Sequence, residues 1–233
     1  MLLISLCLLT LLFVPGIGHK VGGASRWLNY AGFSFQPSEL VKFSLAVFMA
    51  YSMAKKGSNM ESFTKGLLPH LLVAGVFMAL VLLQPDLGAT VIIGCWLLII
   101  LFVGGVKIIQ LLGILALSAP VVLWLILNAD YRLKRWWAFI NPWDDPKGVG
   151  FQIIHSFLAF GSGGIFGTGL GNSKQKLFYL PEAHTDFVFS IAAEELGFLG
   201  VTVIVALFGL LIMRGIKVAL DARDLYRVIW PLA

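Results

Sequence analysis

The sequence has few charged side chains. Among 233 residues, Asp, Glu, Lys and Arg make up 12%, about half of the roughly 25% that is typical of soluble domains. The apolar fraction is 59%, against about 45–50% in soluble proteins. So few charges cannot cover a soluble domain this rich in Leu, Ile, Val and Phe. Most of the chain is therefore predicted to face lipid, and disordered and collagen-like chains are excluded.

Cysteine is also scarce. Cys7 and Cys95 both lie in apolar runs without metal-ligand or disulfide spacing, and they are predicted to pack as small apolar side chains. A disulfide-rich secreted scaffold is excluded. The net charge is +5, but the basic residues fall between apolar runs and form no stripe, as expected of a membrane protein. No nucleic-acid partner is expected.

Long apolar runs indicate the fold class. A bilayer core needs about 20 apolar residues in a helix, and backbone groups in lipid must bond within their own segment. The candidate spans are 1–16, 38–54, 67–85, 88–104, 109–128 and 187–213, and a further run starts at Val228. The sequence predicts an all-α polytopic membrane protein with about six complete transmembrane helices plus the start of another. We expect one transmembrane domain over 1–233, incomplete at both ends.

Lys and Arg predict the sidedness of the loops. The loops on one side of the membrane are rich in Lys and Arg, and they are therefore predicted to be cytoplasmic. The short loops on the opposite side contain only Lys20 and Arg26. The basic residues of the cytoplasmic loops are Lys55, Lys56, Lys65, Lys107, Arg214, Lys217, Arg223 and Arg227. Segments 17–37, 84–87 and the large loop 129–186 then face outward. An outer site has no ATP, so any substrate must arrive already activated.

Two charges share one predicted helix. Pro37 suits the first helical position, and Glu39 and Lys42, three residues apart, lie on one face. A charge within a span costs roughly 2.5–3.5 kcal/mol, so such a pair is either a structural ion pair or part of a polar cavity.

Three other polar residues lie in outer segments. Arg26 and Trp27 either anchor the chain at the interface or form a phosphate site, because a guanidinium offers a planar fork of donors. Asp86 follows Pro85 in a predicted reversal, and it either caps the next helix or contributes to a site.

The large outer loop has its own pattern. An amphipathic stretch over 150–158, together with Trp136, Trp137 and Trp143, predicts short interfacial helices. Six glycines between Gly161 and Gly171 fit neither a dinucleotide nor a P-loop spacing, and they are predicted to permit close packing or movement. Asp144 and Asp145 favour a solvated turn over a divalent-ion site.

The loop ends in Asp186, at the lip of the last complete span. A carboxylate there is either a general base, tuned by low dielectric and nearby charge, or a cap for the helix that it begins. His184 lies two residues earlier. Glu194 lies eight residues later, roughly 12 Å along a helix axis.

Seven short blocks, in order and on one predicted face, resemble the SEDS family (shape, elongation, division and sporulation) of bacterial membrane glycosyltransferases. The resemblance covers essentially the whole chain, and its spelling is closer to the division branch than to the elongation branch. The blocks are Gly-Ala-Ser-Arg-Trp at 23–27, Gln-Pro-Ser-Glu at 36–39, Gln-Pro-Asp-Leu-Gly at 84–88, Asn-Pro-Trp-Asp-Asp-Pro at 141–146, Gly-Ser-Gly-Gly at 161–164, Leu-Pro-Glu-Ala-His-Thr-Asp-Phe at 180–187 and Glu-Glu-Leu-Gly at 194–197.

The resemblance implies an inverting glycosyltransferase of the bacterial cytoplasmic membrane, located at the division septum. Its substrate is lipid II, a disaccharide-pentapeptide on undecaprenyl pyrophosphate, which it polymerises into glycan strands on the outer face. The implied partners are a class B penicillin-binding protein transpeptidase and other divisome proteins. No resident metal is expected; a divalent cation, Mg²⁺ or Mn²⁺, at the pyrophosphate is left open.

The resemblance also assigns roles. The family's essential aspartate corresponds to Asp186, which would act as general base. Arg26 and Lys42 would neutralise the leaving pyrophosphate, with Glu39 holding Lys42. Trp27 would pack on lipid or sugar. The remaining candidate substrate-site residues, which would line or support the cavity, are Asp86, His184 and Glu194.

Two other functions stay open at this stage. A lipid II flippase is compatible with intramembrane charge, although the cytoplasmic half offers little polar chemistry beyond His70. A non-catalytic scaffold for the penicillin-binding protein is the other alternative.

Overall fold

The computed structural model describes residues 1–14, 18–21, 24–30, 33–175 and 186–221. The chain forms two compact units. The first consists of Met1–Leu115 together with Arg214–Ala233, and the second is Ala116–Met213.

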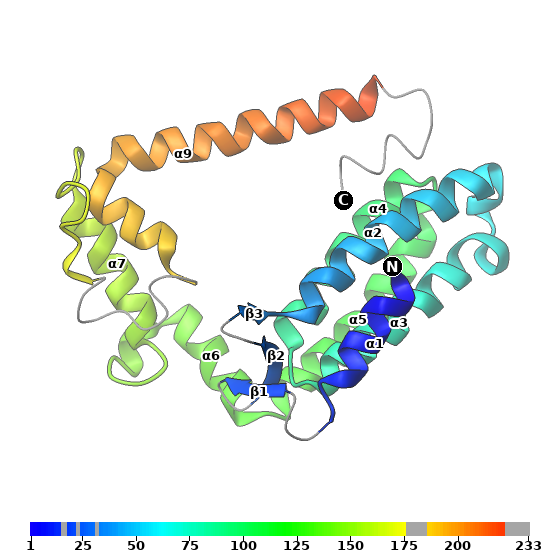
Figure 1. Ribbon diagram of the computed structural model, residues 1–233, viewed down its shortest axis with the longest axis horizontal. Helices are drawn as coiled ribbons and strands as arrows, with labels where there is room; N and C mark the ends of the chain where they lie inside the picture. The colour runs from blue at the N-terminus through cyan, green and yellow to red at the C-terminus, as the bar shows by residue number, and fades with distance from the viewer. Residues whose placement is uncertain (15–17, 22–23, 31–32, 176–185, 222–233) are drawn as a thin grey trace. The chain divides into compact units, whose positions relative to one another are not determined.

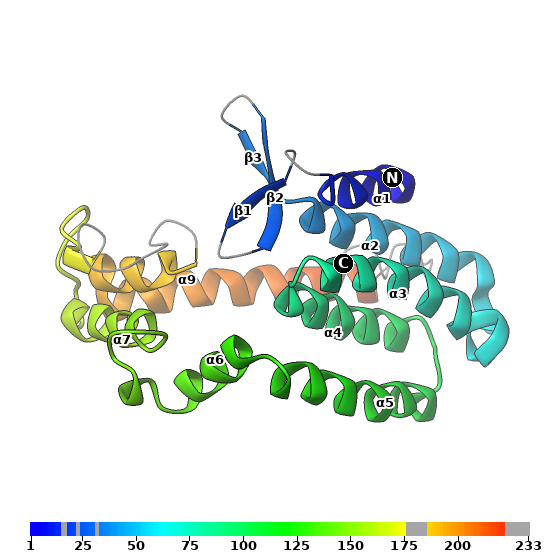
Figure 2. The ribbon, with the colours of Figure 1, turned by 90° about the horizontal axis from the view of Figure 1, so that it is seen from below.

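The first unit is built on apolar helices that follow the predicted runs. They are α1 (Leu2–Leu11), α2 (Pro37–Lys56), α3 (Leu68–Leu83), α4 (Leu87–Val103) and the start of α5 (Ile108–Leu127). Helix α1 packs on α2, and α3 packs on α4 (Figures 1 and 2). A 3₁₀ turn at Gly57–Glu61 and a π-helical turn at Phe63–Leu67 join α2 to α3.

The core of this unit lies between the helices. Leu9, Leu45, Met49 and Ile93 are fully buried in it. Polar side chains link the helices across this core: Ser5 Oγ lies 2.7 Å from Ser44 Oγ. Because lipid competes for no hydrogen bonds, such contacts hold neighbouring helices together in a membrane.

A small sheet lies between α1 and α2, in a segment that the sequence predicts to face outward. Strands β1 (Gly18–Val21), β2 (Ala24–Tyr30) and β3 (Phe33–Phe35) pair antiparallel in the order β1-β2-β3. The sheet is absent from the fold that the sequence predicts, because strands of three to seven residues leave too short an alternating pattern to recognise.

The second unit contains the end of α5, the large loop that the sequence predicts to face outward, and the last helix. Helices α6 (Asp130–Ile140) and α7 (Phe151–Gly163) lie within the loop, with a 3₁₀ turn at Pro142–Asp144 between them. Helix α9 (Val188–Leu220) follows. The predicted interfacial residues Trp136, Trp137 and Trp143 are all exposed, as a position at a membrane surface requires.

Membrane-spanning helices confirm the fold class. Within the described residues, three helices are long and apolar enough to cross a bilayer: Phe63–Leu83, Ile108–Leu127 and Val188–Val218. Helices α1 and α4 are apolar but shorter. The chain is an all-α polytopic membrane protein apart from the small sheet. The predicted span 1–16 is helical only over Leu2–Leu11, and the run from Val228 lies outside the described residues.

Candidate functional site

Asp186 lies at the end of the large loop, two residues before α9. It is exposed, and its carboxylate makes no hydrogen bond or ion pair to any residue in the described ranges. The amides of Ser190 and Ile191, the third and fourth residues of the helix, donate to the carbonyl of Phe187 at 3.0 and 3.2 Å. These bonds involve neither Val188 nor Phe189, whose amides an Asp186 cap would use, so both interpretations of Asp186 stay predictions. His184 lies outside the described residues.

Helix α9 is broken at Gly197, where φ is +67° and ψ is −170°. In a continuous helix the amides of Phe198 and Leu199 would donate to carbonyls four residues earlier. Here they donate to the glycine-rich loop instead: Phe198 N to Gly164 O at 2.8 Å, and Leu199 N to Ile165 O at 3.1 Å. Both amides therefore keep a hydrogen-bond acceptor in spite of the break.

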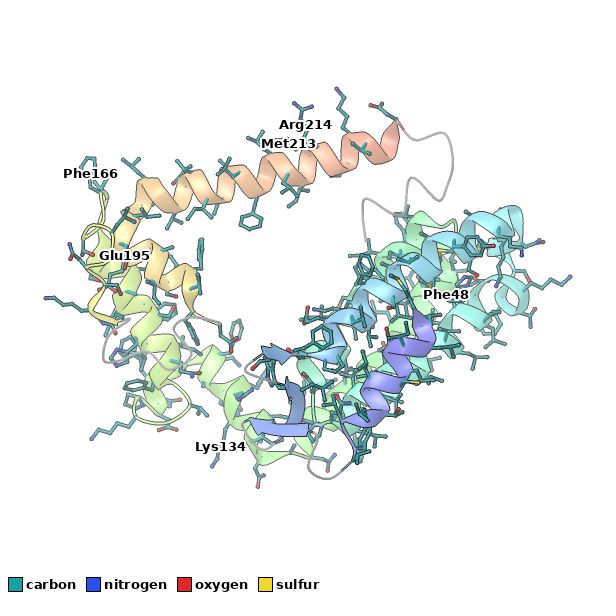
Figure 3. The ribbon with its side chains drawn as sticks, viewed as in Figure 1. Phe48, Lys134, Phe166, Glu195, Met213 and Arg214 are labelled. Carbon is teal, nitrogen blue, oxygen red and sulfur yellow. The ribbon has the colours of Figure 1, made fainter. Side chains whose placement is uncertain are left out.

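The carbonyls released by the break are bonded to the same loop. Glu194 O accepts from Thr168 N at 2.9 Å and from Thr168 Oγ1 at 3.1 Å. Glu195 O accepts from Gly169 N at 3.1 Å. Figure 3 shows Glu195 at the bend of α9 and Phe166 on the loop. Each lost helical bond is thus replaced, as irregular backbone in an apolar region requires.

Small residues make this contact possible. A Cβ on Gly163 would overlap the carbonyl oxygen of Ala193, and a Cβ on Gly167 would overlap that of Glu195. Gly163 and Gly167 therefore permit close packing, one of the two roles that the sequence predicted for the glycines of 161–171.

Glu194 is buried within this junction and is 2% exposed. Its Oε2 accepts from Ser173 Oγ at 2.5 Å and from Gln175 N at 3.4 Å, and its Oε1 accepts from Lys174 N at 3.2 Å. The sequence places Glu194 among the substrate-site residues, whereas in the structure its carboxylate binds residues 173–175 of the same chain. Ser173, which the sequence analysis did not single out, is fully buried beside it.

Glu39 and Lys42 form the ion pair that their spacing predicts. Lys42 Nζ lies 2.8 Å from Glu39 Oε2 on α2, with the Lys42 side chain 33% exposed and that of Glu39 58% exposed. Pro37 occupies the first turn of this helix, as expected. Since the pair is partly exposed, the Lys42 cation is accessible to an anionic ligand while its carboxylate partner restrains it.

Arg26 and Trp27 lie on strand β2. Trp27 is half-buried and pairs with His19, and Ser25 pairs with Lys20. Arg26 is the extra residue between these two pairs, at a β-bulge. Bulges redirect side chains and are frequent near functional sites. The Arg26 side chain lies outside the described part of the structure, so its role stays a prediction.

Asp86 is the N-cap of α4. Its Oδ1 accepts from Ala89 N at 3.0 Å, its carbonyl accepts from Thr90 Oγ1 at 2.7 Å, and the residue is 8% exposed. The capping interpretation is confirmed; a substrate contact stays a prediction.

Replacement of Asp86 separates these roles. Asp86→Ala is expected to lower stability by about 1 kcal/mol through loss of the cap, whereas Asp86→Asn keeps a side-chain acceptor and stays close to the wild type. Thermal unfolding in detergent measures both. An alanine variant as stable as the wild type would contradict the capping role.

The structure places the candidate residues in two groups. Trp27, the Glu39–Lys42 pair and Asp86 belong to the first unit, and Asp186 and Glu194 belong to the second. Within the first unit only Glu39 and Lys42 form an ion pair with each other among the described candidates.

The described residues do not fit a metal centre. They contain no group of three or more His, Cys, Asp or Glu side chains that could hold an ion. Asp144 Oδ1 accepts from Asn141 Nδ2 at 2.7 Å, and Asp145 accepts from the amides of Gly148 and Val149 at 3.0 and 3.2 Å. Both carboxylates serve the turn.

Comparison with known sequences gives consistent relatives. The chain is 49% identical over 219 residues to the probable peptidoglycan glycosyltransferase FtsW of Geobacter sulfurreducens, a match that covers 94% of this chain and 59% of the relative. It is 46% identical over 230 residues to stage V sporulation protein E of Bacillus subtilis, covering 97% and 62%. The chain therefore spans about three fifths of the length of these curated relatives.

Solved structures agree with the fold. A chain of a peptidoglycan synthase complex, studied for its coordination of polymerization and crosslinking, matches with a TM-score of 0.74 and 29% identity, covering 99% of this chain and 63% of that one. The rod shape determining protein RodA of Thermus thermophilus matches with a TM-score of 0.61 and 28% identity, covering 98% and 57%. Residues 1–232 match the family of cell cycle proteins that comprises FtsW, RodA and SpoVE. The chain belongs to this FtsW/RodA/SpoVE family.

Proposed function

We propose that the protein is a peptidoglycan glycosyltransferase that polymerises lipid II on the outer face of the bacterial cytoplasmic membrane during cell division. The observation that carries the proposal is the exposed carboxylate of Asp186 at the start of the broken apolar helix α9. A relative that is 49% identical bears the name of a probable peptidoglycan glycosyltransferase. The polar outer segments and the absence of a nucleotide motif from the sequence suit a donor that carries its own leaving group.

The reaction needs one base. Asp186 accepts the proton of the acceptor sugar's 4-hydroxyl, and that oxygen attacks the anomeric carbon of the donor. The bond from this carbon to the pyrophosphate oxygen breaks, undecaprenyl pyrophosphate leaves with the bonding electron pair, and the anomeric carbon is inverted. A single inverting displacement needs no second carboxylate as nucleophile, in contrast to retaining glycosidases.

Cations stabilise the charge on the leaving group. Lys42, held by Glu39 at 2.8 Å, and Arg26 are the candidates for this role, and Trp27 is the candidate surface for lipid or sugar. Asp144 and Asp145 are bonded within their own turn, so they do not serve as candidate ligands for Mg²⁺ or Mn²⁺ in this reaction.

A transpeptidase is the expected partner. The similar solved chain belongs to a peptidoglycan synthase complex that combines polymerization and crosslinking. We propose that this protein works with a class B penicillin-binding protein and other divisome proteins at the division septum.

The test is direct. The purified protein in liposomes, with its penicillin-binding partner, receives labelled lipid II, and glycan polymer is sought on a gel. Polymer formation is the expected result. Lipid II that crosses the bilayer without polymer would overturn the proposal in favour of a flippase, and polymer made only by the partner would favour a scaffold.

Lys42 provides a more specific prediction. Lys42→Met is expected to lower kcat/KM for lipid II about 10- to 100-fold, the size of one charge-assisted contact, while Lys42→Arg retains most activity. Steady-state polymerisation rates measure the effect. Lys65→Met, in the predicted cytoplasmic loop, is the control. Equal activity of Lys42→Met and the wild type would remove Lys42 from the site.

A further inference from the structure

Glu194 is the most completely bonded acidic side chain of the second unit within the described ranges. Three donors from consecutive residues, Ser173, Lys174 and Gln175, converge on its two oxygens at 2.5 to 3.4 Å. The residue is 2% exposed and Ser173 is fully buried. A carboxylate so enclosed has no accessible oxygen for a sugar or a pyrophosphate, so its contribution must pass through the segment that it binds.

The bonded segment and Glu194 lie on opposite sides of Asp186 in the sequence. Gln175 lies eleven residues before Asp186, and Glu194 lies eight residues after it. The bonds from Glu194 therefore close a loop of chain that has Asp186 within it. We call the bonds from the Glu194 carboxylate to Ser173, Lys174 and Gln175 the clamp. Because closing a loop removes most of the positions that its ends could otherwise take, the clamp restricts the position of Gln175, from which the chain continues to Asp186.

Neighbouring contacts make the clamp stiff on the α9 side. The backbone carbonyl of Glu194 is held by both donors of Thr168 at 2.9 and 3.1 Å, and Ser190 Oγ lies 2.7 Å from Ser156 Oγ on α7. On the other side, His155 Nδ1 lies 2.8 Å from Gln175 Oε1. Both ends of the loop are thus tied to α7 and to the glycine-rich turn.

We propose that Glu194 is a positioning residue: its carboxylate clamps Ser173–Gln175 to α9 and thereby sets the placement of Asp186 for proton transfer. This rests on the proposed function of Asp186. The carboxylate form suits the role, because all three partners are donors and an ionised carboxylate only accepts. A glutamine presents an NH₂ group to at least one backbone amide in either orientation, so one of the three bonds is lost.

The kinetic prediction follows from this geometry. Glu194→Gln is expected to lower kcat for lipid II polymerisation about tenfold and Glu194→Ala about 100-fold, with KM for lipid II unchanged, because small misplacements of a reacting group cost this much. The matched control is Glu195→Gln. Glu195 Oε1 is buried with no hydrogen-bond partner in the described part of the chain. Removal of the Glu195 charge should therefore leave kcat near the wild-type value.

A double-mutant cycle distinguishes the clamp from a general loss of folding. Ser173→Ala should lower kcat by itself, and the Ser173→Ala/Glu194→Gln pair should lose less than the product of the two single effects. Multiplicative effects, or a raised KM for Glu194→Gln at an unchanged kcat, would overturn the proposal, the second because it would make Glu194 a substrate contact.

Hydrogen exchange tests the clamp independently of activity. The amides of Lys174 and Gln175 should exchange at least tenfold faster in Glu194→Gln than in the wild type, with Glu195→Gln unchanged. If the wild type makes no polymer, the proposed function fails while this result still decides the contact. Unchanged exchange in Glu194→Gln would overturn the clamp itself.

Discussion

Asp186→Asn is expected to reduce glycan polymer formation by about 10²–10⁴-fold, the usual contribution of a general base. The amide is nearly the same size as the carboxylate but cannot take the proton of the attacking hydroxyl. Since Asp186 is exposed and bonds to no residue in the described ranges, the substitution removes no internal contact there, and membrane insertion and thermal stability should be retained. Lipid II polymerisation on a gel, beside a detergent melting curve, measures both.

The control is a carboxylate of the first unit, whereas Asp186 belongs to the second. Glu61 lies 3.4 Å from Lys107 as an exposed ion pair, which contributes little to stability, and Glu61→Gln should polymerise lipid II like the wild type. An active and well-folded Asp186→Asn protein would remove Asp186 as the base. Equal loss in Asp186→Asn and Glu61→Gln would point to a general effect of charge.

Gly197→Val is expected to disrupt the second unit. Gly197 has φ +67° and ψ −170°, a backbone region that is essentially restricted to glycine and costs other residues about 1–3 kcal/mol. In addition, its Cβ would overlap Gly167 N and lie 2.6 Å from Ile165 O. The glycine-rich loop would have to leave the break, and four backbone bonds would be lost with it. We expect poor folding in detergent and no polymerisation.

Gly209 on the same helix is the matched control. A Cβ there would meet no atom within 4 Å, so Gly209→Ala should leave folding intact and stabilise the helix by up to about 1 kcal/mol. Size-exclusion profiles and melting temperatures of the two variants decide the comparison. A Gly197→Val protein as stable as Gly209→Ala would mean that the break in α9 is not required.

The broken helix and the candidate base are parts of one structural feature. Asp186 precedes α9, the break lies at Gly197, and the loop that fills the break continues into Ser173 and Gln175, which Glu194 binds. Polar backbone in an apolar region is tolerated only where protein covers it or a cavity lies beside it. The second unit meets this requirement with its own glycine-rich loop, and in doing so it brings a polar segment to the start of the spanning helix.

Local patterns were sufficient for several features of this protein. Apolar runs predicted the main helices, because in lipid both hydrophobicity and backbone bonding act within one segment. The spacing of Glu39 and Lys42 predicted that they share a helix face, where they form an ion pair. The turn before α4 left two roles for Asp86, and one of them is the cap that it forms. The ion pair and the cap each join residues three positions apart, where helix geometry alone determines the neighbours.

Only the tertiary structure decided the features that join distant segments. Gly197 reads as one more residue of an apolar run, and its break becomes stable only because Gly164, Ile165, Thr168 and Gly169 supply the replacement bonds. Likewise, Glu194 is a substrate candidate by sequence, yet it is buried by residues about 20 positions away. The sequence shows how many hydrogen bonds a side chain can donate or accept, but the packing of the chain determines which groups become its partners.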